Sequence, residues 1–168
     1  MKGILLKIRA LVAPVKLPDG DVMVGSRSKG KVHLAATFHH ENEGRDTLFV
    51  MPRKNDQEGP VSMRITALRD LAGMQLSDDV VKDMLIAEGG DGTLESLGGR
   101  LITQVKSSTF EDPGGNKWAL AQRTILADDI IFTMTVGTVE GREKEPQCKE
   151  LEDEIPKIIE GLSRIRNS

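Results

Sequence analysis

The fold is decided by residues 101–139, which read LITQVKSSTFEDPGGNKWALAQRTILADDIIFTMTVGTV. Two turns divide this stretch into three β-runs, residues 101–110, 117–126 and 130–139. The third run is the clearest, because its residues alternate with a period of two between a fully apolar face and a face rich in Thr. The turn at 111–116 contains Pro, Gly and Asn, which supply the fixed or positive φ that a hairpin needs. The pattern predicts an antiparallel meander.

An amphipathic helix is predicted to follow, from Pro146 to Arg166. Pro146 suits the first helical position, where its missing N–H costs nothing. Acidic residues lie early and basic residues late, which complements the helix macrodipole. Apolar residues recur at three- and four-residue steps: Leu151, Ile155, Ile158, Ile159, Leu162 and Ile165. Because an internal proline costs about 3 kcal/mol, a kink or a break into two helical pieces is expected at Pro156.

Shorter β-runs and one helix are predicted before the meander. The β-runs are residues 21–26, 31–38, 47–51 and 61–67, with loops at 39–46 and 53–60. Ser77 caps a helix over residues 78–86, and the glycine-rich residues 88–99 end it. The predicted fold class is therefore α+β, with an antiparallel β-sheet of about six strands packed against a middle helix and a C-terminal helix.

Length and composition bound the class of protein. The 168 residues suit a single α+β domain at 16–168, preceded by an extension at 1–15 that is either a strand or a basic amphipathic helix. Lys7 and Arg9 interrupt what would otherwise resemble a signal peptide, so a cytoplasmic location is favoured over export. No apolar run reaches the length of a bilayer span, so no integral membrane segment is expected. An aromatic content of 3% without Tyr disfavours nucleic-acid binding.

No metal site is assigned to the histidines. His33 is predicted on a strand, while His39 and His40 adjoin Glu41 in a predicted loop. His33 and His39 would lie roughly 20 Å apart along an extended strand, too far to share one metal ion. We therefore expect solvated loop histidines.

Structural roles are also favoured for other candidate residues. Asp128 and Asp129 fall between two β-runs, where a turn is favoured over an acid–base pair because adjacent strand residues diverge. Cys148, the single Cys, cannot form an internal disulfide. It lies near a helix start, where a thiolate could be stabilised, but an ordinary helix-face position is favoured. Trp118 could cover a pocket, but packing against the closing helix is favoured.

The sharpest motif is Gly89-Gly90-Asp91-Gly92-Thr93. The same string occurs in diacylglycerol, sphingosine and NAD kinases, and its glycines would let backbone amides approach phosphate oxygens. That interpretation makes Leu85-Ile86-Ala87 a parallel strand that ends in a phosphate loop. The downstream meander opposes it, because it offers no α/β alternation to build a parallel sheet. The alternative is a helix that stops at Gly89 and Gly90, followed by a turn at Asp91-Gly92.

The order of the elements resembles the PsbP-like family. The matching pieces are the turn Leu17-Pro18-Asp19-Gly20, the strand Val61–Leu68 before a Ser/Asp-rich helix, Gly98-Gly99-Arg100 ahead of the meander, and the apolar stripe of the terminal helix. The family includes Ran-binding import factors, bacterial lipoproteins and small secretion-system chaperones. The resemblance therefore implies a non-enzymatic binding or assembly protein without a shared catalytic set.

The leading hypothesis is a protein-binding module, such as a chaperone, adaptor or assembly factor, that uses one sheet face or a loop rim. It implies a protein partner, no enzymatic activity and no cofactor, and it assigns no catalytic, cofactor-binding or metal residue. The sequence leaves the oligomeric state open. The alternative is a nucleotide- or lipid-phosphate-handling enzyme built on Gly89–Thr93.

Overall fold

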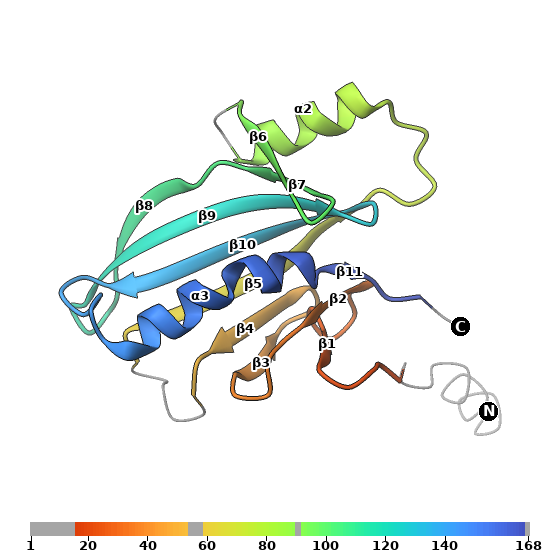
Figure 1. Ribbon diagram of the computed structural model, residues 1–168. Helices are drawn as coiled ribbons and strands as arrows, with labels where there is room; N and C mark the ends of the chain where they lie inside the picture. Colours follow the sequence, from red (N-terminus) through yellow and green to blue (C-terminus); the bar gives the residue numbers. More distant parts are fainter. Residues whose placement is uncertain (1–15, 54–58, 90–91, 167–168) are drawn as a thin grey trace, which may run out of the picture.

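The computed structural model describes residues 16–53, 59–89 and 92–166, which form two antiparallel sheets and two helices (Figure 1). The small sheet consists of β1 (Asp21–Met23), β2 (Gly30–His33) and β11 (Ser163–Arg164), in that order. The large sheet consists of β3 (His39–Glu43), β4 (Thr47–Met51), β5 (Val61–Asp70), β6 (Leu94–Leu97), β7 (Arg100–Thr103), β8 (Lys106–Glu111), β9 (Lys117–Ala127) and β10 (Ile130–Val139). Its order is β3-β4-β5-β10-β9-β7-β6, and β8 pairs with β9 on the same edge as β7. The helices are α2 (Asp78–Gly89) and α3 (Pro146–Glu160).

The predicted α+β class is confirmed, as are the antiparallel meander and the two helices. β9 and β10 occupy the second and third predicted runs. The hydroxyl of Ser77 caps α2 by accepting a hydrogen bond from the N–H of Val80 at 3.3 Å. The first run is divided between β7 and β8, which are separated by Gln104 and Val105 and pair with different parts of β9.

Two strands lie in segments that were expected to be loops. β3 falls within residues 39–46 and pairs with β4, so His39 and His40 lie on a strand and the predicted loop is wrong. β6 falls within residues 88–99 and pairs with β7. Both strands are at sheet edges, where polar residues are tolerated, so no apolar alternation marked them. The large sheet therefore has eight strands instead of about six.

The strand predicted over residues 31–38 is wrong beyond His33. The chain leaves β2 there: the N–H of Leu34 donates to the carbonyl of Gly20, and that of Phe38 donates to Ala35 in a turn. Leu34 and Phe38 are nevertheless buried. Their alternating burial explains why the sequence pattern extended the strand.

α3 covers one face of the large sheet and forms the main core with it (Figure 1). Met63 and Ile65 of β5 and Phe132 and Met134 of β10 are fully buried in this core. The small sheet lies on the same side, because Gly30 of β2 approaches the ring of Phe132 so closely that a Cβ would lie 2.6 Å from it. The period-two alternation of these residues thus marks the face that α3 covers.

α3 continues through Pro156 as one helix, so the break, one of the two alternatives expected there, is wrong, and the kink stays a prediction. Leu151 and Ile158, on either side of the proline, are both buried in the main core. Burying one such side chain contributes about 1.5–3 kcal/mol. Two of them offset the cost of an internal proline, about 3 kcal/mol.

The closing helix ends at Glu160, earlier than the predicted Arg166. The chain then turns at Gly161, and Ser163 and Arg164 pair with β2 as β11. Leu162 is fully buried beyond the helix end. Leu162 therefore continues the apolar spacing of the helix although it belongs to the turn. This explains why the sequence pattern predicted a helix that extends beyond Glu160.

α2 packs on the opposite face of the large sheet, at one end of it. Leu85 of α2 is buried with Leu71 and Ile131 in a second, smaller core. Ile131 adjoins Phe132 on β10, so the two cores lie on opposite faces. No helix of the described residues covers the remainder of this second face.

The N-terminal extension at 1–15 lies outside the described residues. Within the part of the chain that the structure describes, neither helix is long and apolar enough to cross a membrane.

Candidate functional site

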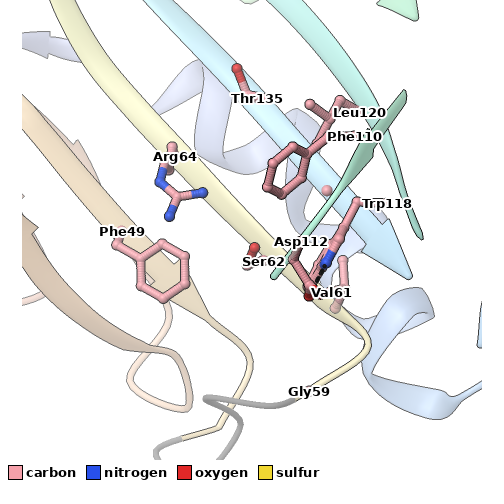
Figure 2. A pocket seen from close by; sticks show the side chains of 11 residues that line it. Phe49, Gly59, Val61, Ser62, Arg64, Phe110, Asp112, Trp118, Leu120 and Thr135 are labelled. Atoms are coloured by element: carbon pink, nitrogen blue, oxygen red, sulfur yellow. Dashed lines mark hydrogen bonds between the residues drawn. The ribbon is translucent and has the colours of Figure 1, made fainter. Parts of the chain in front are cut away.

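A hollow of about 210 Å³ lies on the uncovered part of the second sheet face, and we call it the open-face hollow (Figure 2). The side chains that line it include Phe49, Arg64, Phe110, Trp118, Leu120 and Thr135. Strand register explains why they share a face. Phe49 lies opposite Arg64, which lies opposite Thr135. Phe110 lies opposite Trp118 at the other side of the hollow.

Aromatic side chains are concentrated in this hollow. The chain has four Phe and one Trp, of which Phe38 and Phe132 are buried in the main core. The other three line the open-face hollow, and Phe110 is 51% exposed. In a chain so poor in aromatic residues, gathering the uncommitted ones on one uncovered face is typical of a binding surface.

Trp118 is held against the sheet from two sides. Its indole Nε1–H donates to Oδ2 of Asp112 at 3.0 Å. Below it, Gly137 of β10 leaves the space that the ring occupies, since a Cβ there would lie 3.2 Å from both Trp118 and Leu120. The ring is therefore held in one orientation.

Asp112 organises the turn between β8 and β9 as well as the indole. Its carboxylate accepts hydrogen bonds from the backbone N–H of Asn116 at 2.9 Å and from the Asn116 side chain at 3.2 Å. The hydrogen bond from Trp118, followed by that from the Asn116 backbone, lowers the pKa of Asp112 below its usual value. Asp112 is thus a charged acceptor at neutral pH with its oxygens already engaged.

Arg64 forms the opposite wall of the hollow. Its guanidinium carbon lies 4.9 Å from the centroid of the Phe49 ring, within cation–π range. Glu43 accepts hydrogen bonds from Nε and Nη2 of Arg64 at 2.9 and 3.4 Å. This fork-like pairing orients the guanidinium plane while leaving the side chain exposed.

The described residues of the lining offer binding groups. Their titratable side chains are Arg64 and Asp112, and both are engaged as described above. Ser62 and Thr135 supply hydroxyls, but among the described residues the lining contains no His, Cys or Lys to activate a nucleophile. A larger groove, of about 510 Å³, runs between α3 and β7, but no aromatic side chain lines it. The open-face hollow is therefore the better candidate.

Trp118 lies on the sheet face opposite α3, so its predicted packing against the closing helix is wrong. Its neighbours on β9, Ala119 and Ala121, are the residues that face Cys148 of α3. A pocket-covering role for Trp118 was one of the sequence-based expectations, whereas Phe49, Arg64 and Phe110 were not expected at a site. The available signal was the scarcity of aromatic residues, combined with their positions in β-runs.

The structure does not provide the strand that a phosphate loop requires at Gly89–Thr93. Leu85-Ile86-Ala87 is helical and belongs to α2, so the predicted helix is confirmed and the parallel strand of the phosphate-loop interpretation is not formed. Gly89 is buried at the end of α2, where a Cβ would lie 2.5 Å from Thr103. Close packing against Thr103 therefore explains why a glycine occupies position 89. Gly90 and Asp91 lie outside the described residues.

Two of the three histidines, His33 and His39, are paired with carboxylates. Nδ1 of His33 lies 2.9 Å from Oδ1 of Asp21, and Nε2 of His39 lies 3.3 Å from Oε1 of Glu41. Across residues 16–53, 59–89 and 92–166, no group of three or more His, Cys, Asp or Glu side chains is arranged to hold a metal ion.

Asp128 and Asp129 form the tight turn that was predicted. Both have positive φ, 48° and 63°, as in the type I′ turns that join twisted antiparallel strands. The Asp128 carboxylate also accepts a hydrogen bond from the backbone N–H of Arg164 at 3.2 Å.

Cys148 is buried, as expected for an ordinary helix-face residue. Burial, followed by the charge of Glu145, raises the pKa of its thiol, so its surroundings do not stabilise a thiolate.

Comparisons with known proteins define the fold alone. No family model matches the chain, and no curated protein matches it. Among solved structures, a protein from Bacteroides thetaiotaomicron aligns with a TM-score of 0.54 and 11% identity, over 90% of this chain and 50% of that one. The chain thus spans about half the length of that protein. At this identity the likeness shows a shared fold.

Two further structures align with a TM-score of 0.34 each. One is PA94 of Pseudomonas aeruginosa, a protein of unknown function, with 13% identity over 85% of this chain and 87% of that one. The other is LpqN of Mycobacterium tuberculosis, involved in cell envelope biogenesis, with 14% identity over 91% of this chain and 83% of that one. The resemblance to the PsbP-like family stays a prediction.

Proposed function

We propose that this protein is a non-enzymatic protein-binding module, acting as a chaperone, adaptor or assembly factor, and that it holds its partner in the open-face hollow. The observation that carries the proposal is the preorganised Trp118 beside the exposed Phe110. Trp and Arg dominate the hot spots of protein interfaces. A ring that is already held in place loses little conformational entropy when a partner binds.

The size of the hollow supports a protein partner. Sites that enclose drug-sized ligands measure about 300–1,000 Å³. The open-face hollow, at about 210 Å³, is smaller and suits one anchoring side chain of a partner. The guanidinium of Arg64 lies at its rim, where a partner's carbonyl or carboxylate oxygen can accept a hydrogen bond.

Peptide selection tests this proposal. A phage-displayed library of random peptides is panned on the wild-type protein, and the selected peptides are then titrated against the wild type and Phe110→Ser. The surviving peptides are expected to carry an aromatic or aliphatic anchor and to change the emission of Trp118, the one Trp in the chain. Their affinity should fall about tenfold or more in Phe110→Ser.

The matched control is Val80→Ser in α2, because Val80 is 43% exposed and Phe110 is 51% exposed. Peptide affinity should be unchanged in this variant. Peptides that bind both variants as tightly as the wild type would overturn the assignment of the hollow.

The enzyme hypothesis predicts a different result. Mg²⁺ and ATP should raise the melting temperature, and Asp91→Ala should abolish the rise. The helical state of Leu85-Ile86-Ala87 and the burial of Gly89 weigh against this outcome. A rise that is lost in Asp91→Ala would replace the binding module with a nucleotide-handling enzyme.

A further inference from the structure

β8 is an open edge of the large sheet beside the open-face hollow. It pairs with β9 on one side, and all six of its residues are exposed. β6 covers the outer side of β7, but no described strand pairs with the outer side of β8. Figure 1 shows β8 at the rim of the sheet, with no strand beyond it. On this side of β9, β7 has an outer neighbour, β6, whereas β8 has none among the described strands. The position beside β8 is therefore open to one more strand.

Resting on the proposed function, we propose that an extended segment of the partner protein adds to β8 as an antiparallel strand. Every strand pair of the large sheet in the described residues is antiparallel, so an antiparallel addition continues the existing pattern. An edge strand presents unpaired N–H and C=O groups that such a segment satisfies. The partner's side chain opposite Phe110 then packs on that exposed ring, at the rim of the hollow.

The charges of β8 define the chemistry of the segment. Lys106 begins the strand, Glu111 ends it, and the four residues between them are uncharged. Neither charge forms an ion pair with another described residue. An antiparallel segment therefore complements β8 when a basic residue comes first, opposite Glu111, and an acidic residue comes five positions later, opposite Lys106. An apolar residue follows the basic one, opposite Phe110.

The opposite edge of the sheet lacks these properties. β3 carries His39, His40, Glu41 and Glu43 in a strand of five residues. Charged side chains along an edge discourage the addition of further strands. Compared with β3, β8 is an edge strand whose central residues leave the backbone approachable.

A second copy of the chain is a poorer fit than a partner segment. When a two-fold axis joins two β8 strands in one continuous sheet, each face of one copy continues as the same face of the other. Paired residues must therefore come from the same face. Lys106 and Glu111 are an odd number of positions apart and lie on opposite faces, so they can never pair with each other across such an axis. A register centred on Thr109 would place Lys106 opposite Asp112, whose oxygens already bind Trp118 and Asn116.

Two hexapeptides with capped ends test the proposal. KVTVTE has the complementary charges, and EVTVTK has the same composition with the charges exchanged. Titration of isotope-labelled full-length protein, followed by NMR, should shift the amide signals of residues 106–111. KVTVTE should bind about fivefold more tightly than EVTVTK. The double variant Lys106→Glu/Glu111→Lys should reverse this preference.

Backbone pairing has its own control. N–H groups of alternate residues point toward the same neighbour in a strand pair. We therefore compare two methylated forms of KVTVTE, one methylated on both Val backbone nitrogens and the other on both Thr backbone nitrogens. One form should lose binding and the other should keep it. Equal binding by both methylated peptides would overturn the strand addition.

The remaining outcomes are also decisive. Equal affinity of KVTVTE and EVTVTK, or shifts that avoid residues 106–111, would overturn the edge proposal. If peptides from the library still require Phe110 in that case, the proposed function stands without the edge. A dimer in sedimentation that protects the amides of residues 106–111 from exchange would assign the edge to a second copy instead.

Discussion

The indole Nε1–H of Trp118 donates a hydrogen bond to Oδ2 of Asp112 at 3.0 Å, across the turn that joins β8 to β9. One carboxylate thereby shapes the turn, orients the aromatic wall of the hollow and lies at the end of the open edge strand. The turn and the open-face hollow are consequently one structural unit. This coupling allows the site to be tested at residues that need not touch a partner.

Asp112→Ala should release the indole of Trp118. We expect its emission maximum to move to longer wavelength and its fluorescence anisotropy to fall, because the ring loses its only described hydrogen-bond acceptor. Library peptides should bind several-fold more weakly. Asp83→Ala, which removes an exposed carboxylate of α2, is the control and should leave both readouts unchanged. An unchanged emission in Asp112→Ala would show that the carboxylate does not orient the ring.

Gly137→Ala should displace the same ring from below. A Cβ at this position would lie 3.2 Å from Trp118 and Leu120, so both side chains must shift by a few tenths of an ångström. We expect altered Trp118 emission and weaker peptide binding, with little change in melting temperature, because alanine also removes the entropic cost of glycine in a strand, about 0.5–1 kcal/mol. Thr138→Ala, which lies on the other face of β10, is the matched control. Peptide affinity equal to that of the wild type would contradict the seating role of Gly137.

The pair of Asp70 and Arg164 should make stability depend on acid pH. Nη2 and Nη1 of Arg164 lie 2.5 and 3.2 Å from the Asp70 carboxylate, and this hydrogen bonding chiefly lowers the pKa of Asp70 to about 2. The unfolded chain has an Asp pKa of about 3.9. Since the folded pKa is the lower one, the stabilisation is present above about pH 4 and is lost as the pH falls toward about 2.

Thermal unfolding of the wild type and Asp70→Asn at several pH values measures this dependence. The difference in melting temperature should be constant from about pH 7 to 5 and should shrink below about pH 4. Asp79→Asn, an exposed residue of α2, should show no such difference. A gap between wild type and Asp70→Asn that persists unchanged to about pH 2 would exclude the ion pair as its source.

Pro156→Ala should stabilise the protein. Pro156 is exposed inside α3 and cannot donate the backbone hydrogen bond of an ordinary helical residue. Restoring that bond should raise the free energy of unfolding in urea by about 1–3 kcal/mol. Lys157→Ala, the exposed neighbour, should change it by no more than about 0.5 kcal/mol. A loss of stability in Pro156→Ala would indicate that the proline is required by the packing of α3.

The elements of this fold were predictable where their signals are local. The period of two in residues 130–139 located β10, the cap at Ser77 located α2, and the adjacent aspartates located a tight turn. The edge strands β3 and β6 escaped because an edge strand lacks the buried alternation that marks a central one. The break predicted at Pro156 was wrong because a local cost was offset by burial that sequence spacing does not measure.

The sequence by itself determined the meander, the closing helix and the antiparallel pairing that follows Gly89–Thr93, because periodicity, turn residues and caps act between near neighbours. Only the tertiary structure decided which sheet face stays uncovered and which residues meet on it. Phe49, Arg64 and Trp118 are far apart in the chain and are brought together by cross-strand register. Register and helix placement are set by long-range packing, and no local pattern contains them.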